Sequence, residues 1–175
     1  MRKTGLIIVF ILFLLPASLL PAQPGDLITF ETADLDGNNV TEALFTSNKL
    51  TMINVWGTFC PPCIREMPDL GRLGSDCKDK GVQIVGIVID ALDRYGRLDS
   101  KVKDDARKII DRTKAYYLHI VPTIAMFSGL LKDVQVVPTT IFVDSDGHQI
   151  GEAYLGSRSY KDWKKIIDNL LEVAD

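Results

Sequence analysis

The sequence predicts an α/β fold, and three stretches of the 175-residue chain support this prediction. A mostly apolar run of strand length, residues 50–56, precedes an amphipathic helical pattern over residues 61–79. A near-continuous apolar run then covers residues 82–89, as is typical of a central strand buried on both faces. A strand, a helix and a strand in this order predict a right-handed βαβ unit with two parallel strands.

The beginning of the chain differs in composition from the rest. Arg2 and Lys3 precede an uninterrupted apolar run over residues 6–15. This pattern predicts that residues 1–22 are a secretory signal peptide or an uncleaved membrane anchor. In both cases the single folded domain, residues 26–175, lies outside the cytoplasm. The formal net charge of −3 disfavours nucleic acid as a partner.

Two short strands are expected ahead of the βαβ unit. Residues 26–30 and the segment 34–40, which contains Gly37, predict these strands around a turn. The next stretch, residues 41–49, predicts a weak helix or a loop that joins them to the first strand of the unit.

The middle of the chain combines a loop with a helix. Residues 90–100 are polar and predict a loop, after which apolar residues at helical spacing predict an amphipathic helix over residues 100–116. Residues 118–121 predict a short strand. A short helical turn is expected over residues 128–133.

The last part of the chain predicts a hairpin and a helix. Strands are expected over residues 139–143 and 149–154, with a turn at residues 144–147 between them. Ser159 is the expected N-cap of the final helix. Apolar residues share one face of that helix, namely Trp163, Ile166, Ile167, Leu170 and Leu171.

Two cysteines lie just after the predicted strand 50–56, at the start of the helix that follows it. Cys60 is the expected N-cap, followed by Pro61 and Pro62 at the first helical positions, where proline is well tolerated. Unpaired N–H groups and the helix dipole favour the thiolate, so the pKa of Cys60 should fall and Cys60 should be the exposed nucleophile. Cys63 lies one turn later, within reach to form a disulfide with Cys60 or to resolve a mixed disulfide.

Glu66 falls on the apolar stripe of this helix. The stripe spans an arc of about 120° and holds Cys63, Glu66, Met67, Leu70, Leu73 and Cys77. Burial should raise the pKa of Glu66 and suit it to exchange a proton with Cys63. Alternatively, Glu66 lies at the margin of the stripe and supports the first turns, because Pro68 must bend the helix. We expect Cys77 to be a buried small hydrophobe; an intermolecular bridge or a regulatory thiol are the alternatives.

The run WGTFCPPC followed by IREMP resembles the active site of the TlpA/ResA-like thiol–disulfide oxidoreductases, which are membrane-tethered or secreted proteins of the thioredoxin superfamily. The shared features are Cys-x-x-Cys, Trp56 before it, Glu66 after it and the Met-Pro that follows. Asn54 agrees with this family and departs from cytosolic thioredoxin, which has Asp there. The resemblance implies a thioredoxin-like fold with an N-terminal β-hairpin and a central helical insertion, residues 100–116.

The resemblance also implies a cis proline that faces the cysteines. Val-Pro-Thr occurs twice, around Pro122 and Pro138, and only Pro138 precedes the expected hairpin and helix. We therefore assign the cis bond to Pro138, although most X–Pro bonds are trans. By the same resemblance, Trp56, Val137 and Pro138 form the substrate-binding site, with the backbone of Val137 pairing with a bound peptide.

The function expected from the resemblance is reduction of disulfides in exported proteins, for example in cytochrome c or copper-site assembly. Electrons would come from a membrane thiol donor, and we expect no cofactor. A disulfide-forming oxidant is the alternative, but Pro61 and Pro62 each remove an N–H group that would stabilise the thiolate. A peroxidase is disfavoured. Peroxiredoxins have a Thr or Ser three residues before a single reactive cysteine, whereas Thr58 lies two residues before Cys60.

A metal-binding chaperone is the remaining alternative, and it is poorly supported. One Cys-x-x-Cys supplies two ligands, whereas structural zinc takes four. His119 is expected in a strand and His148 in a turn, so both read as incidental to function. We therefore expect no metal site.

Overall fold

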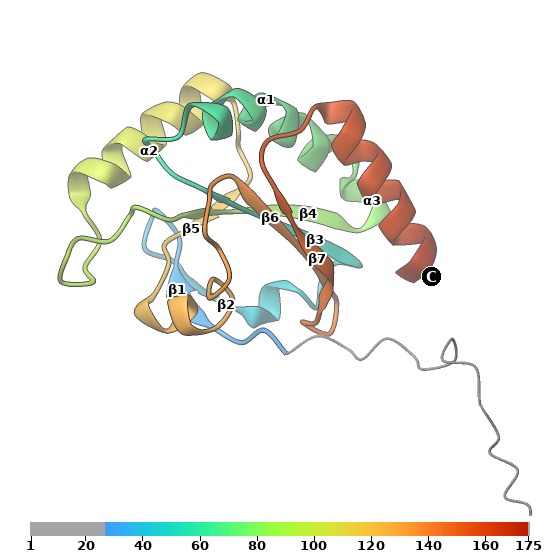
Figure 1. The fold of residues 1–175 in the computed structure, drawn as a ribbon, viewed down its shortest axis with the longest axis horizontal. Helices are drawn as coiled ribbons and strands as arrows, with labels where there is room; N and C mark the ends of the chain where they lie inside the picture. The colour runs from blue at the N-terminus through green and yellow to red at the C-terminus, as the bar shows by residue number, and fades with distance from the viewer. Residues whose placement is uncertain (1–26, 175) are drawn as a thin grey trace, which may run out of the picture.

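The computed structural model describes residues 27–174; the signal peptide or anchor expected over residues 1–22 lies outside the described residues. At the centre is a five-stranded sheet in the order β5-β4-β3-β6-β7 (Figure 1). Its strands are, in chain order, β3 (Leu50–Trp56), β4 (Val82–Val88), β5 (Leu118–Ile120), β6 (Thr139–Asp144) and β7 (Gln149–Leu155).

Strand β3 occupies the middle of the sheet and every residue in it is buried. It runs parallel to β4, as the predicted βαβ unit requires, and antiparallel to β6. The register places Asn54 between Gly86 of β4 and Thr140 of β6. The centre of the sheet therefore carries a polar side chain with close neighbours on both sides.

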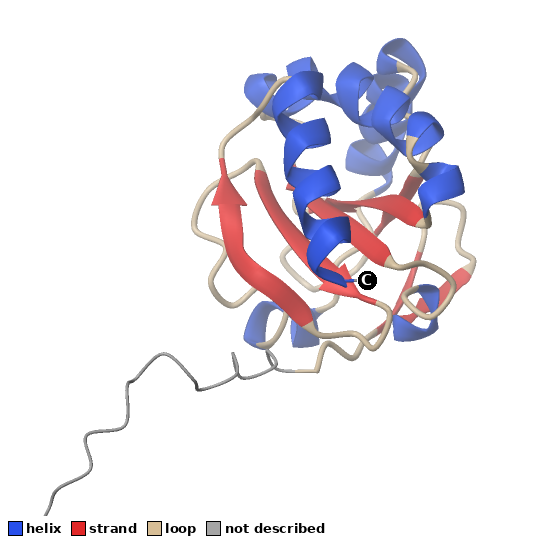
Figure 2. Cartoon of the chain, turned by 90° about the vertical axis from the view of Figure 1, so that its right-hand side faces the viewer, coloured by secondary structure: helices blue, strands red, loops and turns tan. Residues whose placement is uncertain are grey.

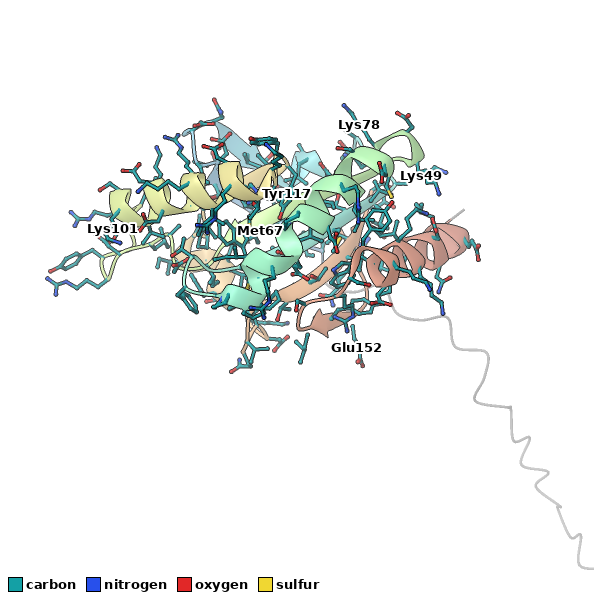
Figure 3. The ribbon with its side chains drawn as sticks, turned by 90° about the horizontal axis from the view of Figure 1, so that it is seen from above. Lys49, Met67, Lys78, Lys101, Tyr117 and Glu152 are labelled. Carbon is teal, nitrogen blue, oxygen red and sulfur yellow. A yellow bond between two sulfur atoms is a disulfide. The ribbon has the colours of Figure 1, made fainter. Side chains whose placement is uncertain are left out.

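Three helices cover one face of this sheet (Figures 1 and 2). They are α1 (Pro61–Asp76), α2 (Ser100–Thr113) and α3 (Tyr160–Ala174), and α1 lies between the other two (Figure 3). Side chains at alternate positions of β3 face these helices, among them Met52 and Trp56. The α1 helix, which begins with the cysteines, is therefore held against the sheet and flanked on both sides.

Shorter segments cover the opposite face. A hairpin of β1 (Glu31–Ala33) and β2 (Asn39–Thr41) lies there with two 3-10 helices, η2 (Glu42–Leu44) and η4 (Ile124–Ser128). The buried core of this face is formed by apolar side chains from these segments and the sheet, including Ile28, Phe30, Phe45, Ile53, Val55, Met126 and Ile141. The two faces of the sheet are thus buried by different kinds of structure.

Three elements lie at positions that differ from the sequence prediction. The first strand of the hairpin is Glu31–Ala33 and not 26–30, because Ile28 and Phe30 are buried in the core instead of pairing along a strand. The second strand, expected over 34–40, is Asn39–Thr41, because the Asp34 carboxylate accepts from the N–H groups of Asp36 and Asn38 and holds these residues in a turn. The helical turn expected at 128–133 is η4, where Thr123 caps the start by accepting from the N–H group of Met126 at 3.4 Å.

Two helices end earlier than expected. Helix α1 ends at Asp76 and gives way to a 3-10 turn, η3 (Lys78–Lys80), before Gly81 reverses the chain with φ of 77°. Helix α2 ends at Thr113 because Lys114 adopts the left-handed conformation, with φ of 55°. The remaining strands and α3 lie within a residue or two of their predicted bounds. Between residues 27 and 174, no helix has the length and apolar character needed to cross a membrane.

Candidate active site

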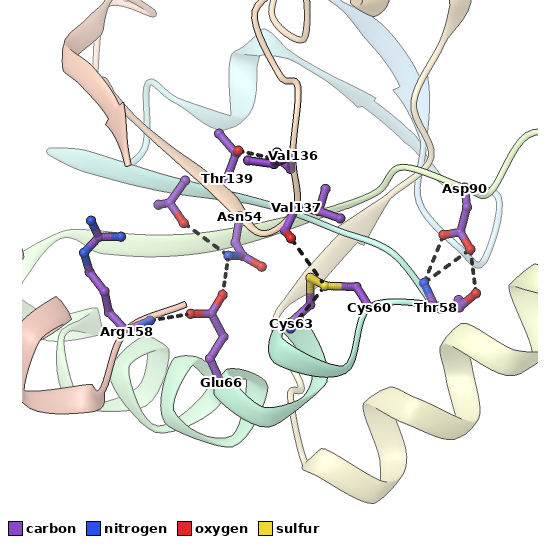
Figure 4. Close-up of a disulfide and its surroundings, with 11 residues drawn as sticks. Asn54, Thr58, Cys60, Cys63, Glu66, Asp90, Val136, Val137, Thr139 and Arg158 are labelled. Atoms are coloured by element: carbon purple, nitrogen blue, oxygen red, sulfur yellow. Dashed lines mark hydrogen bonds between the residues drawn. A yellow bond between two sulfur atoms is a disulfide. The ribbon is translucent and has the colours of Figure 1, made fainter. Parts of the chain in front are cut away.

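Cys60 and Cys63 are joined in a disulfide at the start of α1 (Figure 4). Cys60 is the N-cap, and its Sγ accepts the backbone N–H of Cys63 at 3.2 Å. Only 4% of Cys60 is exposed, and Cys63 has no exposed surface. Cys60 is thus the more accessible residue of the pair, but the expectation of an exposed residue is wrong, because the loop that carries Val137 packs over it.

That loop contains a cis peptide bond between Val137 and Pro138, as expected, whereas Pro122 does not follow a cis bond. The carbonyl oxygen of Val137 lies 3.6 Å from Cys60 Sγ. The hydroxyl of Thr139 donates to the carbonyl of Val136 at 2.7 Å and fixes the turn of the loop. The structure therefore brings the disulfide and the cis-proline loop, which are more than 70 residues apart in sequence, into direct contact.

Glu66 is buried beneath α1, with 4% of its surface exposed. Its carboxylate accepts from Asn54 Nδ2 at 3.0 Å, from the backbone N–H of Arg158 at 3.0 Å and from Trp163 Nε1 at 3.4 Å. Burial raises the pKa of Glu66, and these hydrogen bonds oppose the rise. The predicted buried acid is present, one helical turn after Cys63, and its donors come from β3 and from the C-terminal segment that holds Arg158 and Trp163.

Trp56 packs in the same buried cluster as the two cysteines and makes a polar contact with His119. Trp56 has no exposed surface, and its indole N–H donates to His119 Nδ1 at 3.2 Å. His119 Nε2 pairs with the carbonyl of Ala115 at 2.9 Å, which fixes the ring. Burial lowers the pKa of His119 to about 4, so its ring is neutral at pH 7. Gly86 makes this contact feasible, because a Cβ there would lie 2.3 Å from His119 Nδ1.

The loop between β3 and α1 is tied to the end of β4. The N–H group of Thr58 donates to Asp90 Oδ1 at 3.1 Å, and its hydroxyl donates to the same carboxylate. Sequence reasoning missed Asp90, although an acid directly after a predicted central strand was a usable signal. This contact fixes the residues that lead into Cys60.

Comparison with known proteins agrees with this geometry. The family model described as Redoxin matches residues 21–171. The chain belongs to the Redoxin family. It is 35% identical over 104 residues to "Thiol-disulfide oxidoreductase ResA" of Halalkalibacterium halodurans, covering 55% of this chain and 57% of that one. A second ResA, from Bacillus thuringiensis subsp. konkukian, is 32% identical over 70% of this chain and 64% of its own length. The chain therefore spans less than two thirds of either relative.

Solved structures show the fold. A thiol:disulfide interchange protein of the thioredoxin family from Chlorobium tepidum superposes with a TM-score of 0.70 at 22% identity, covering 87% of this chain and 99% of that one. A thiol:disulfide interchange protein from Bacteroides sp. superposes with a TM-score of 0.62 at 25% identity, covering 84% of this chain and 91% of that one. The Redoxin domain described here thus has the thioredoxin-like fold that the motif predicted.

Cys77 and Phe59 are two further residues of the Redoxin domain whose burial was in question. Cys77 is a free, fully buried cysteine whose pKa is raised by burial, as expected for a small hydrophobe in the core. Phe59, directly before Cys60, is 66% exposed, and sequence reasoning missed it. Within residues 27–174, no three His, Cys, Asp or Glu side chains are grouped to hold a metal ion.

Proposed function

We propose that this chain is a thiol–disulfide oxidoreductase that reduces disulfides of exported proteins through Cys60 and Cys63. One observation carries the proposal: the disulfide lies at the N-terminus of α1, directly against the cis-proline loop. In this proposal Cys60, the less buried of the two residues, reacts with the substrate disulfide, and the fully buried Cys63 lies behind it. The names of the ResA relatives and of the thiol:disulfide interchange proteins support the same chemistry.

The first step is attack by the Cys60 thiolate on a substrate disulfide. The N–H of Cys63 and the positive end of the α1 dipole stabilise this thiolate. A bond forms between Cys60 Sγ and one substrate sulfur, and the other substrate sulfur leaves as a thiolate. The backbone of Val137, beside Cys60, pairs with the substrate chain, while Pro138 holds the loop in place and Trp56 supports the site from within.

The second step releases the substrate. The thiol of Cys63 gives its proton to Glu66, which lies one turn further along the same face of α1. The Cys63 thiolate attacks Cys60 Sγ, re-forming the disulfide and expelling the second substrate sulfur as a thiolate. Two electrons pass from the dithiol to the substrate, so the reaction needs no cofactor beyond the cysteines themselves.

The sequence supports a setting outside the cytoplasm for this chemistry. The apolar segment within residues 1–22 supports export or anchoring, so that the domain works outside the cytoplasm. A membrane thiol donor then restores the dithiol after each turnover. Exported proteins with disulfides, including those of cytochrome c or copper-site assembly, are the proposed substrates.

The direction of electron flow is tested by the reduction potential of the Cys60–Cys63 pair. We expect a value of about −270 mV, typical of a reductant, when the protein is equilibrated with defined thiol buffers. A value of about −120 mV would instead identify a disulfide-forming oxidant. Cys63→Ser should trap a mixed disulfide with a model substrate, visible by mass spectrometry, whereas Cys77→Ser should react like the unsubstituted chain.

A further inference from the structure

Asn54 holds a buried amide whose hydrogen bonds are only partly made. The residue has no exposed surface. Its Nδ2 donates to Glu66 Oε1 at 3.0 Å and to Thr140 Oγ1 at 3.1 Å. Its Oδ1 is buried and finds no hydrogen-bond donor among the described residues. A buried acceptor without a hydrogen bond raises the free energy of the folded protein. We therefore expect that another state of the protein supplies a donor as the partner of this oxygen.

The orientation of the side chain indicates that partner. Asn54 faces α1, on the same side of β3 as Trp56. In Figure 4 its amide nitrogen points toward Glu66 and its amide oxygen points toward the disulfide. Disulfide sulfurs carry no hydrogen, but reduction creates a thiol on Cys63, which can donate. The unpaired oxygen is therefore matched to the reduced state.

We propose that Asn54 is a positioning residue whose amide turns over as the proton of Cys63 moves to Glu66. The inference rests on the proposed function, because it requires a reduced Cys63. Before the move, the Cys63 thiol donates to Oδ1, and Nδ2 donates to the Glu66 carboxylate. After the move, the Cys63 thiolate accepts from Nδ2, and the protonated Glu66 donates to Oδ1. One proton passes from Cys63 Sγ to a Glu66 oxygen, the amide stays neutral, and the total charge is unchanged.

Thr140 permits both orientations of the amide. It lies directly opposite Asn54 in the β3–β6 pairing, and its hydroxyl can accept or donate a hydrogen bond. It therefore accepts from Nδ2 in one orientation and donates to Oδ1 in the other. An aspartate at position 54 would only accept, and as an anion it would repel the ionised Glu66.

The other ionisable groups around the pair do not compete for this proton. Arg158 contributes a backbone N–H and a positive charge that lower the pKa of Glu66, against the larger effect of burial. Burial and the charge of Glu66 raise the pKa of Tyr117, which stays neutral. His119 is neutral because burial lowers its pKa. Cys60 is linked to substrate during the second step, which leaves Cys63 and Glu66 to share the proton.

The test is nuclear magnetic resonance on the reduced full chain in detergent, with 13C-labelled cysteine and 15N-labelled asparagine. The Cβ signal of Cys63 reports its ionisation, and the side-chain amide signals of Asn54 report its orientation. As the pH is raised, we expect the Cβ signal of Cys63 and the amide signals of Asn54 to change with the same midpoint. Amide signals of Asn54 that stay constant while Cys63 ionises would overturn the proposal, and this measurement needs no substitution.

Variants give a second, independent measurement. Asn54→Leu removes the donor that stabilises the Cys63 thiolate, so the Cys63 midpoint should rise by about one pH unit, a tenfold change in ionisation. Asn54→Asp, which keeps the shape of the side chain, should raise it at least as far. Thr51→Val alters a buried hydroxyl of the same strand that bonds Gln83 on the opposite face, and should leave the midpoint unchanged. Equal midpoints in all four proteins would overturn the proposal.

The outcome is separable from that of the proposed function. Turnover of a model disulfide substrate is measured on the same unsubstituted protein. A chain without turnover at any pH refutes the proposed function and, with it, the role of Asn54. If the chain reduces disulfides but its Asn54 amide signals stay constant while Cys63 ionises, only the role of Asn54 is refuted.

Discussion

Glu66 shows how one buried residue couples the cysteines to pH. Its carboxyl is enclosed by α1, β3 and the start of α3, and burial raises its pKa above the ordinary value of 4.5. The folded chain therefore binds this proton more tightly than the unfolded chain does. Stability from this proton is fully present below about 4.5 and is lost as pH rises through the pKa of the folded state.

Glu66→Gln removes this dependence, because an amide does not ionise. We expect the free energy of unfolding of the variant to rise relative to the unsubstituted chain as pH increases above about 4.5, by about 1.4 kcal/mol per unit of pKa shift. Urea unfolding of both oxidised proteins between pH 4 and 8 measures the difference. Glu152→Gln, at an exposed acid of β7, is the matched control. A difference that stays constant across this range would contradict the prediction.

At the scale of the element, the N-terminus of α1 determines the properties of Cys60. Pro61 and Pro62 occupy its first two positions, so the N–H of Cys63 is the first one available to the capping sulfur. N-cap acceptors draw on the N–H groups of the second or third helical residue. The missing N–H at the second position therefore limits how far the helix stabilises a thiolate.

Pro62→Ala restores that N–H group. We expect the pKa of Cys60 to fall and the reduction potential to become more positive by about 30 mV or more, because hydrogen bonds to charged groups contribute about 1.5–3 kcal/mol. Pro61→Ala is the matched control, since the N–H of the first helical residue is not the one that N-caps bind. The measurement is the reduction potential of both variants and of the unsubstituted chain in the same thiol buffers. Equal shifts in both variants would show that helix stability, and not the restored donor, is responsible.

At the scale of the whole molecule, the proposed reductant should be more stable when oxidised. A strong oxidant is one whose reduced form is the stabilised one, so a reductant has the opposite balance. We expect the unfolding midpoint in denaturant to fall when the protein is treated with dithiothreitol. The double variant Cys60→Ser, Cys63→Ser should show no such change. A midpoint that rises on reduction would favour the oxidant.

The pattern of the sequence predicted most of this molecule. Strands β3, β4, β6 and β7 and helix α3 were predictable because their apolar residues recur with a clear period. The segment 27–30 was not, because its buried side chains are directed into the core by contacts with distant parts of the chain. The end of α2 was likewise set by the backbone of Lys114, in a conformation that no apolar pattern reveals.

The candidate site likewise combines residues that the sequence predicted with residues that it did not. Cys60, Cys63 and Glu66 were predictable because their spacing on one helix is a local property. The cis bond at Pro138 needed the family resemblance. Arg158 and Trp163 were missed as partners of Glu66, since sequence gives no signal that residues more than 90 positions apart will meet.

The position of Arg158, just ahead of α3, makes the C-terminal end of the chain part of the candidate site. Two of the three residues that donate to Glu66 belong to this last segment, although neither contributes a sulfur. Truncation before residue 158 would leave the carboxylate with Asn54 alone and open its side of the core to water. Such a shortened chain would keep both cysteines and lose the contacts that hold the proposed proton acceptor of Cys63 in place.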